Sequence, residues 1–239
     1  MLVEKMTMPA FERGLNATKT AVIPFGSVEE HGLHLPLGTD TIHAYELARE
    51  AGRQYPLFVT PPVWYGLCRS TGCHPGTISI TGGTVRRLGV EIVMSLYRQG
   101  LRNFVLLSGH AGGTHVAALT DAGEEILETT EDARIAVLSI LDLVAAIPGD
   151  IVETEGDSHA GEVETSLMQH LRASWVNGTS PAEYPSFSSP ILARNKKKFW
   201  PGGVWGDPSK ASSQKGEVIL KREAELLVEL VRKLEKFKD

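Results

Sequence analysis

The chain has 239 residues, of which 42% are hydrophobic and 22% are charged, with a formal net charge of -5 at pH 7. This composition is typical of a globular protein, and the acidic balance disfavours non-specific binding to nucleic acid. No apolar run approaches the roughly 18 residues that a membrane-spanning helix needs, and residues 1–15 lack the apolar core of a signal peptide. Cys68 and Cys73 are interpreted as reduced thiols, so we expect a cytoplasmic protein without nucleic-acid or membrane partners.

Stretches of strand type and of helix type alternate along the chain. Strands are predicted at 20–27, 57–63, 76–80, 103–109 and 134–141, and helices at 41–55, 84–101, 113–129, 160–171 and 216–239. Thr84 is the expected N-cap of its helix. Apolar strands separated by helices indicate an α/β fold, with a mostly parallel sheet that helices cover on both faces.

The first cluster of polar side chains, Glu29, His31, His34 and Asp40, directly follows the first strand. Carboxylates and imidazoles together suit zinc, manganese or ferrous iron. Glu29 and His31 project to the same side of an extended chain, and Asp40 could bridge two metals through its two oxygens. Helix capping by Asp40 or Thr39 is an alternative for that position, but it does not explain the other three residues.

The second cluster lies in the sequence SGHAGGTH, where His110 follows the carboxyl end of the fourth strand. Ligands of parallel sheets collect beyond the carboxyl ends of the strands, so we expect His110 to meet the first cluster there. His115 lies a turn inside the next helix and is expected to pack or to support the site. The glycine-rich turn lacks the spacing and the lysine of phosphate-binding loops.

The third cluster lies in the sequence DSHAGEVETS, which begins at Asp157. On a helical wheel one face is apolar, with Ala160, Val163, Leu167 and Leu171. Glu164 flanks this face and Glu162 lies nearly opposite, so we expect Glu164 to be buried and Glu162 to be solvated. A buried carboxylate needs a cation or a proton. His159 is a candidate acid or base, although capping together with Asp157 and Ser158 explains it equally well.

Three weaker features could line the same site. The basic run 194–198 is either a solvated face or a contact for a substrate phosphate. The segment 200–208, which contains Trp205, is rich in glycine and aromatic residues, as lid loops often are. His74 precedes a predicted strand and could bind substrate, though a role in an ordinary turn is equally consistent.

The three clusters together resemble the creatininase family of metal-dependent amidohydrolases. The match is close over 22–40, 109–113 and 159–165, and weaker similarity at 76–80 and 202–212 extends it over nearly the whole chain. The resemblance implies a single three-layer α/β/α domain over residues 1–239. It also implies a two-metal site and a ring-like homo-oligomer, often a hexamer.

The resemblance also assigns roles to individual residues. By position, the metal ligands are Glu29, His31, Asp40 and His110. Asp40 falls on the bridging ligand and His159 on a catalytic histidine, while His34 is expected to orient a ligand or the substrate. In creatinine-hydrolysing members the position of Gly112 is acidic and binds the second metal, so here Glu164 would have to complete the site.

Other departures make creatinine a poor candidate substrate. The family motif NGHGGN is SGHAGG here, with Ser108 and Gly113 in place of asparagines. The creatininases proper also carry a substrate-loop tryptophan, and no residue from Val116 to Ser158 is tryptophan. Both differences affect positions at which the family supports or contacts its substrate.

We therefore predict hydrolysis of a non-peptide C–N bond, in a cyclic amide or a formamide, by a metal-bridging hydroxide. Two divalent metal ions, zinc first with manganese or iron as alternatives, would activate the water, and His159 would protonate the departing nitrogen. Three alternatives stay open. They are a formamidopyrimidine-nucleotide deformylase that holds phosphate at 194–198, a small-peptide peptidase, and an inactive metal- or ligand-binding protein.

Overall fold

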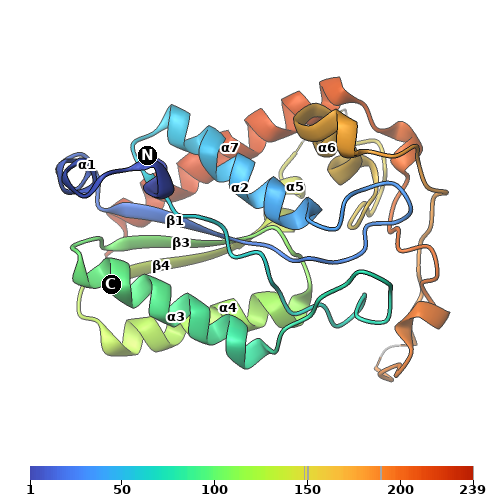
Figure 1. Ribbon diagram of the computed structural model, residues 1–239, viewed down its shortest axis with the longest axis horizontal. Helices are drawn as coiled ribbons and strands as arrows, with labels where there is room; N and C mark the ends of the chain where they lie inside the picture. The colour runs from blue at the N-terminus through green and yellow to red at the C-terminus, as the bar shows by residue number, and fades with distance from the viewer. Residues whose placement is uncertain (148, 150, 189, 239) are drawn as a thin grey trace.

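The computed structural model describes residues 1–147, 149, 151–188 and 190–238. Within them, parallel strands form one four-stranded sheet in the order β2-β1-β3-β4 (Figure 1). The strands are β1 (Thr20–Phe25), β2 (Phe58–Val59), β3 (Asn103–Ser108) and β4 (Arg134–Ser139). Thr20 pairs with Asn103, and Phe25 pairs with Ser108, so β1 and β3 end side by side.

Helices cover both faces of the sheet, as the continuous apolar strands predict. The helices of more than one turn are α1 (Met8–Gly14), α2 (Thr39–Gln54), α3 (Gly82–Arg98), α4 (Gly113–Thr129), α5 (Ile140–Val144), α6 (Glu162–Arg172) and α7 (Ser213–Lys236). Short 3-10 turns lie at Val3–Lys5, Ala173–Trp175, Lys196–Lys198 and Pro208–Lys210.

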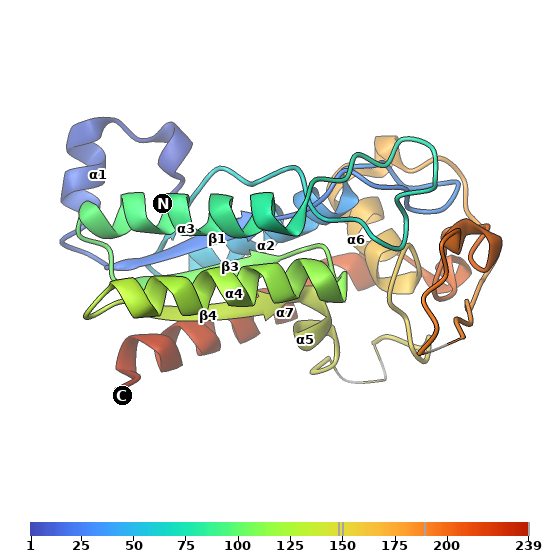
Figure 2. The same ribbon diagram turned by 90° about the horizontal axis from the view of Figure 1, so that it is seen from below.

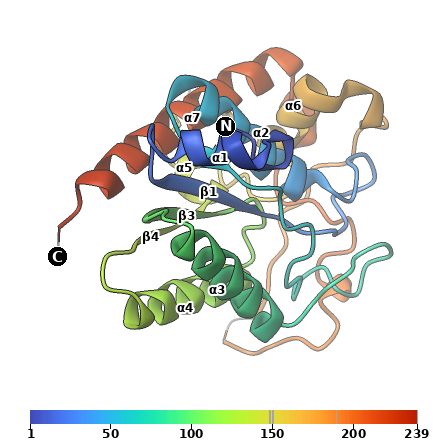
Figure 3. The ribbon, with the colours of Figure 1, turned by 60° about the vertical axis from the view of Figure 1, so that its left-hand side comes forward.

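Successive residues of β1 point to opposite faces and so build two hydrophobic cores. Val22 packs with α2 and α7 on one face, whereas Ile23 packs with α3 and α4 on the other (Figures 1 and 3). The predicted three-layer α/β/α arrangement with a parallel sheet is therefore confirmed. None of the described helices combines the length and hydropathy that a bilayer crossing requires.

Several predicted boundaries are wrong, for local reasons. The strand at 57–63 shrinks to β2, because Pro61 and Pro62 cannot donate ladder hydrogen bonds. The segment 76–80 forms isolated bridges instead of a strand, with Ile78 opposite Val28. The helix that was expected to be capped by Thr84 begins earlier, at Gly82, and Thr81 caps it.

The N-cap of α2 is Gly38, which has no side chain to cap with. Neither Thr39 nor Asp40 is therefore the cap, and the carboxylate of Asp40 is left free for other partners. The last helix begins at Ser213 rather than 216, and the Oγ of Ser212 accepts a hydrogen bond from its first turn. Asp239, the predicted end of that helix, lies outside the described residues.

Candidate metal centre

The polar clusters meet beyond the carboxyl ends of β1 and β3, at the end of the molecule where the loops gather (Figure 2). The loop after β1 carries Glu29 and His31, the turn after β3 carries His110, and the first turn of α6 carries Glu164. These residues and Asp40 are all buried. The structure thus brings together residues that lie more than a hundred positions apart in the sequence.

We call Glu29, Asp40 and His110 the first position. The Nδ1 atom of His110 lies 2.7 Å from Oε1 of Glu29 and 3.1 Å from Oδ2 of Asp40. The opposite ring atom, Nε2, donates to the backbone carbonyl of Leu67 at 3.0 Å. That hydrogen bond fixes the tautomer and turns Nδ1 toward the carboxylates.

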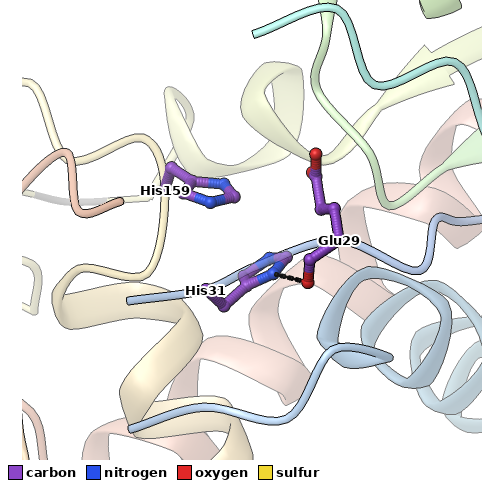
Figure 4. Close-up of side chains that lie close together, drawn as sticks. All are labelled: Glu29, His31 and His159. Carbon is purple, nitrogen blue, oxygen red and sulfur yellow. Dashed lines mark hydrogen bonds between the residues drawn. The ribbon is translucent and has the colours of Figure 1, made fainter. Parts of the chain in front are cut away.

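We call His31, Asp40 and Glu164 the second position. The Nε2 atom of His31 lies 2.9 Å from Oδ1 of Asp40 and 3.6 Å from Oε2 of Glu164. Its Nδ1 atom donates to the backbone carbonyl of Glu29 at 3.1 Å (Figure 4). Asp40 therefore turns one oxygen toward each position, and the Oγ of Ser27 donates to its Oδ2 at 2.7 Å.

The charges of this cluster are unbalanced. Burial opposes protonation of His31, but Asp40 and Glu164 outweigh it and raise its pKa well above the usual range. In the same way Glu29 and Asp40 overcome burial and raise the pKa of His110. Three buried carboxylates still face two imidazoles. The donors of His31, Asp40 and Glu164 lie within 4.8 Å of one another, and so do donors of Glu29, His110 and Cys68. A divalent metal held there would balance the acids.

Glu164 is buried as predicted, but the prediction that Glu162 is solvated is wrong. The Glu162 side chain is 0% exposed, and its Oε1 lies 2.5 Å from the ammonium of Lys215 on α7. It also accepts hydrogen bonds from the backbone of Glu153 and Thr154. A helical wheel assumes one buried face, whereas α6 packs on α2 and α7 and has two.

His159 stands over the second position, with its ring centroid 4.2 Å from that of His31 (Figure 4). Its Nε2 atom lies 2.9 Å from the backbone carbonyl of Glu30 and 3.6 Å from the carboxylate of that residue. Asp157 instead bonds the start of α6, because its carboxylate oxygens accept hydrogen bonds from the amides of Glu162 and Val163. Of the two interpretations of His159, the capping one is therefore not needed.

The other predicted histidines surround the cluster. His34 is buried between the hydroxyls of Ser180 and Thr165, at 2.9 and 2.8 Å. Burial and the charge of His31 lower the pKa of His34 to about 4. His115 accepts from the amide of Leu67 at 3.1 Å and packs against His110.

A cavity of about 460 Å³ opens above both positions. Its wall includes the ligand candidates Glu29, Asp40, His110 and Glu164, together with His159, Trp200 and Trp205. His74 is not among its lining residues; its Nε2 atom lies 2.9 Å from the backbone carbonyl of Trp200, which does line the cavity. Lys196, in the basic run, does line the cavity, 3.5 Å from Ser70.

Sequence reasoning missed several residues of this site. Glu30 is buried beside His159. Nothing in the sequence assigned a role to Glu30 as well as to its neighbour Glu29. The Thr71 hydroxyl donates to Glu29, and Arg69 lines the cavity, but neither belongs to a polar motif. Cys68 lies beside the first position, and burial near Glu29 and Asp40 raises the pKa of its thiol.

Comparisons with known proteins identify the family of the chain. The family model described as creatininase, creatinine amidohydrolase, matches residues 4–231. A mycofactocin precursor peptide peptidase of Mycolicibacterium smegmatis is 32% identical over 83% of this chain and 78% of its own length. A creatinine amidohydrolase of Pseudomonas putida is 26% identical over 92% of each chain.

Solved structures give the same result for the fold. A creatinine amidohydrolase (creatininase) superposes with a TM-score of 0.87 at 23% identity, covering 98% of this chain and 97% of that one. Creatininase structures described as a Zn-Zn type and as an Mn form each give a TM-score of 0.84 at 24% identity. They cover 100% of this chain and 98% or 99% of theirs.

Proposed function

The chain belongs to the creatininase family, and we propose that it hydrolyses a non-peptide amide C–N bond of a small molecule with two divalent metal ions. The observation that carries this proposal is the placement of Asp40. Its Oδ1 lies 2.9 Å from His31 and its Oδ2 lies 3.1 Å from His110. One carboxylate shared by two buried donor sets is the arrangement that a binuclear hydrolase needs.

Each metal position has a suitable donor set. Glu29, Asp40 and His110 would hold one ion, and His31, Asp40 and Glu164 would hold the other. When bound, the two ions would supply a water of lowered pKa and an electrophile for the amide oxygen. Zinc is the metal we expect, with manganese and iron as alternatives, since nitrogen and carboxylate oxygen accept all three. Creatininase structures with zinc and with manganese support this choice.

Hydrogen bonds behind the cluster keep these donors in place. Ser27 holds Asp40, the carbonyl of Leu67 holds His110, and the carbonyl of Glu29 holds His31. Such hydrogen bonds orient the donors before substrate arrives, so little reorganisation is left for the reaction itself.

We assign the proton that the departing nitrogen receives to His159. Burial lowers the affinity of its ring for a proton, but the hydrogen bond with Glu30 and the surrounding carboxylates raise its pKa above the usual value. Nε2 is engaged by the carbonyl of Glu30. This leaves Nδ1 as the atom that would release the proton to the leaving group.

The cavity suits a small substrate. Its volume of about 460 Å³ lies in the range of pockets that enclose single small molecules. Trp200 and Trp205 line the cavity with ring centroids 5.9 Å apart, and their aromatic surface suits a planar amide such as a cyclic amide or a formamide. In this proposal His34 orients the ligands from behind, and His74 acts on substrate only through Trp200.

A second candidate is hydrolysis of a phosphorylated formamide, such as a formamidopyrimidine nucleotide. Two cationic side chains, Arg69 and Lys196, line the cavity and favour an anionic group there. Lys196→Glu should then raise KM for a phosphorylated formamide by roughly 10-fold or more. Lys198→Glu is the matched control, because Lys198 is exposed and does not line the cavity. Equal KM values for the two variants would argue against this substrate.

A third candidate is a small-peptide peptidase, which the 32% identity with a mycofactocin precursor peptide peptidase favours. Release of amino acids from short peptides, under conditions that leave cyclic amides and formamides intact, would replace our first proposal with this one. A protein that binds metal yet leaves every amide and peptide untouched would instead be a metal- or ligand-binding protein.

The first experiment measures metal content by mass spectrometry on untagged protein prepared without chelator, with Glu29→Gln alongside. We expect close to two ions per chain in the wild type and fewer in the variant, followed by turnover in a panel of cyclic amides and formamides. Absence of metal after addition of zinc, manganese and iron would overturn the proposal.

We further propose that the chain forms one domain over residues 1–239 and assembles into a cytoplasmic homo-oligomer, a hexamer. Large exposed apolar side chains near the site, including Trp64, Tyr65 and Ile78, support association between copies. Light scattering on the purified protein measures the assembly, and a monomer at working concentration would contradict it.

A further inference from the structure

Cys68 lies beside the first position, close to Glu29 and His110. Its sulfur, a carboxylate oxygen of Glu29 and a ring nitrogen of His110 all lie within 4.8 Å of one another, and all three residues are buried. The four donors of a tetrahedral zinc site are roughly 3.3 to 3.8 Å apart, given metal–ligand distances of about 2.0 to 2.3 Å. The upper bound of 4.8 Å on the observed cluster exceeds that geometry by about 1 to 1.5 Å.

The backbone around Cys68 is held by the site itself. The carbonyl of Leu67 accepts from Nε2 of His110 at 3.0 Å, and the amide of Leu67 donates to His115 at 3.1 Å. The amide of Cys68 donates to the hydroxyl of Ser79 at 2.9 Å. A thiol on such a clamped segment keeps a fixed position relative to the imidazole of His110.

We propose that Cys68 is an additional ligand of the metal at the first position, next to Glu29, Asp40 and His110. This inference rests on the metal centre of the proposed function. On coordination the thiol releases its proton to solvent, and the sulfur donates an electron pair to the cation, so no oxidant or reductant is involved. An ordinary packing cysteine would make no such bond.

A sulfur ligand also determines which metal the first position prefers. Thiolates favour zinc and other softer cations, whereas sites of carboxylate and imidazole alone also accept manganese. The first position should therefore bind zinc in preference to manganese. The second position has only nitrogen and oxygen donors among its three residues, so it should discriminate less.

The test uses cobalt(II) as a coloured substitute for the native metal. The chain has two cysteines, and Cys73 is exposed, so Cys73→Ser leaves Cys68 as the remaining thiol. We expect wild type and Cys73→Ser loaded with cobalt to show the near-ultraviolet charge-transfer absorption of a thiolate–cobalt bond. Cys68→Ser should bind cobalt without that absorption.

Zinc affinity gives a second measurement. Cys68→Ser should weaken zinc binding at the first position by at least about 10-fold, since loss of even an outer partner of a ligand costs that much. Its manganese affinity should change little, and Cys73→Ser should match the wild type in both.

The possible failures are distinguishable. Cobalt bound to Cys73→Ser without charge-transfer absorption would overturn the role of Cys68 and leave the proposed function intact. This result does not depend on whether Cys68→Ser folds. If neither cobalt nor zinc binds the wild type, the proposed metal centre itself is wrong, and the inference is lost with it.

Discussion

The two proposed metal positions share Asp40 but are built in different ways. The first takes Glu29 and His110 from the segments that follow β1 and β3, two neighbouring strands in register. The second takes His31 from the same loop after β1, but it takes Glu164 from α6, a helix whose location depends on packing against α2 and α7. The first position therefore follows from the sheet, whereas the second depends in addition on contacts between helices.

Removing the shared ligand should have the largest effect. Asp40→Asn deprives both positions of a carboxylate, so we expect loss of both metal ions and of turnover. The measurement is metal content together with activity. Circular dichroism that matches the wild type would show that the fold persists. Retention of both ions in this variant would disprove the bridging role.

Removing a ligand that belongs to only one position should abolish metal binding there and leave the other position occupied. Glu29→Gln and Glu164→Gln should each retain about one ion per chain, and each should lower kcat on the order of 100-fold or more, since the metal contributes to charge stabilisation. A third variant, Glu162→Gln, serves as the control on α6. It should keep both metals and lose about 1–3 kcal/mol of stability, because Lys215 and two amides lose a charged partner. If Glu164→Gln keeps two ions, another residue completes the second position.

An acid at residue 112 should damage the first position rather than rebuild the creatininase site. A Cβ atom at Gly112 would lie 2.5 Å from Nε2 of His110, which is fixed on the carbonyl of Leu67. We expect Gly112→Glu to displace His110 and to weaken metal binding by roughly 10- to 100-fold. Gly113→Glu is the matched control, since a Cβ there meets nothing within 4 Å. Equal metal affinity in both variants would refute this prediction.

The smallest expected effect concerns the support of the second position by His34. Its folded pKa is about 4, below the ordinary value of 6.5, so the unfolded chain binds the proton more readily. Stability should therefore fall as the pH drops from about 6.5 toward 4, by at most roughly 3 kcal/mol from this group.

Denaturant unfolding of metal-free protein at several pH values measures this slope. His34→Gln should flatten it, and His170→Gln, at an exposed position near the end of α6, should leave it unchanged. Identical slopes in the wild type and His34→Gln would show that another group controls the pH dependence.

The difference between the two positions also explains what sequence could predict. Alternating apolar strands and helices predicted the sheet, and the rule for strand ends brought His110 to the first cluster. Glu162 was misjudged because a wheel drawn for one helix contains no information about α7. Glu30 lies inside the first cluster, but the sequence alone does not distinguish its role from that of Glu29. Cys68 gave no sequence signal, since it lies in a loop with neither apolar periodicity nor a metal-ligand motif.

The ion pair between Glu162 and Lys215 has a consequence for the order in which the protein is assembled. Lys215 lies in the first turn of α7, which follows every other helix and strand described here. During synthesis, at about 5–20 residues per second, the sheet and its strand-end donors are complete before α7 leaves the ribosome. Glu162 then has no cationic partner, and α6 lacks the helix against which it packs. The donors of the proposed first position are thus synthesised before α7, whereas the proposed second position is complete only when α7 docks.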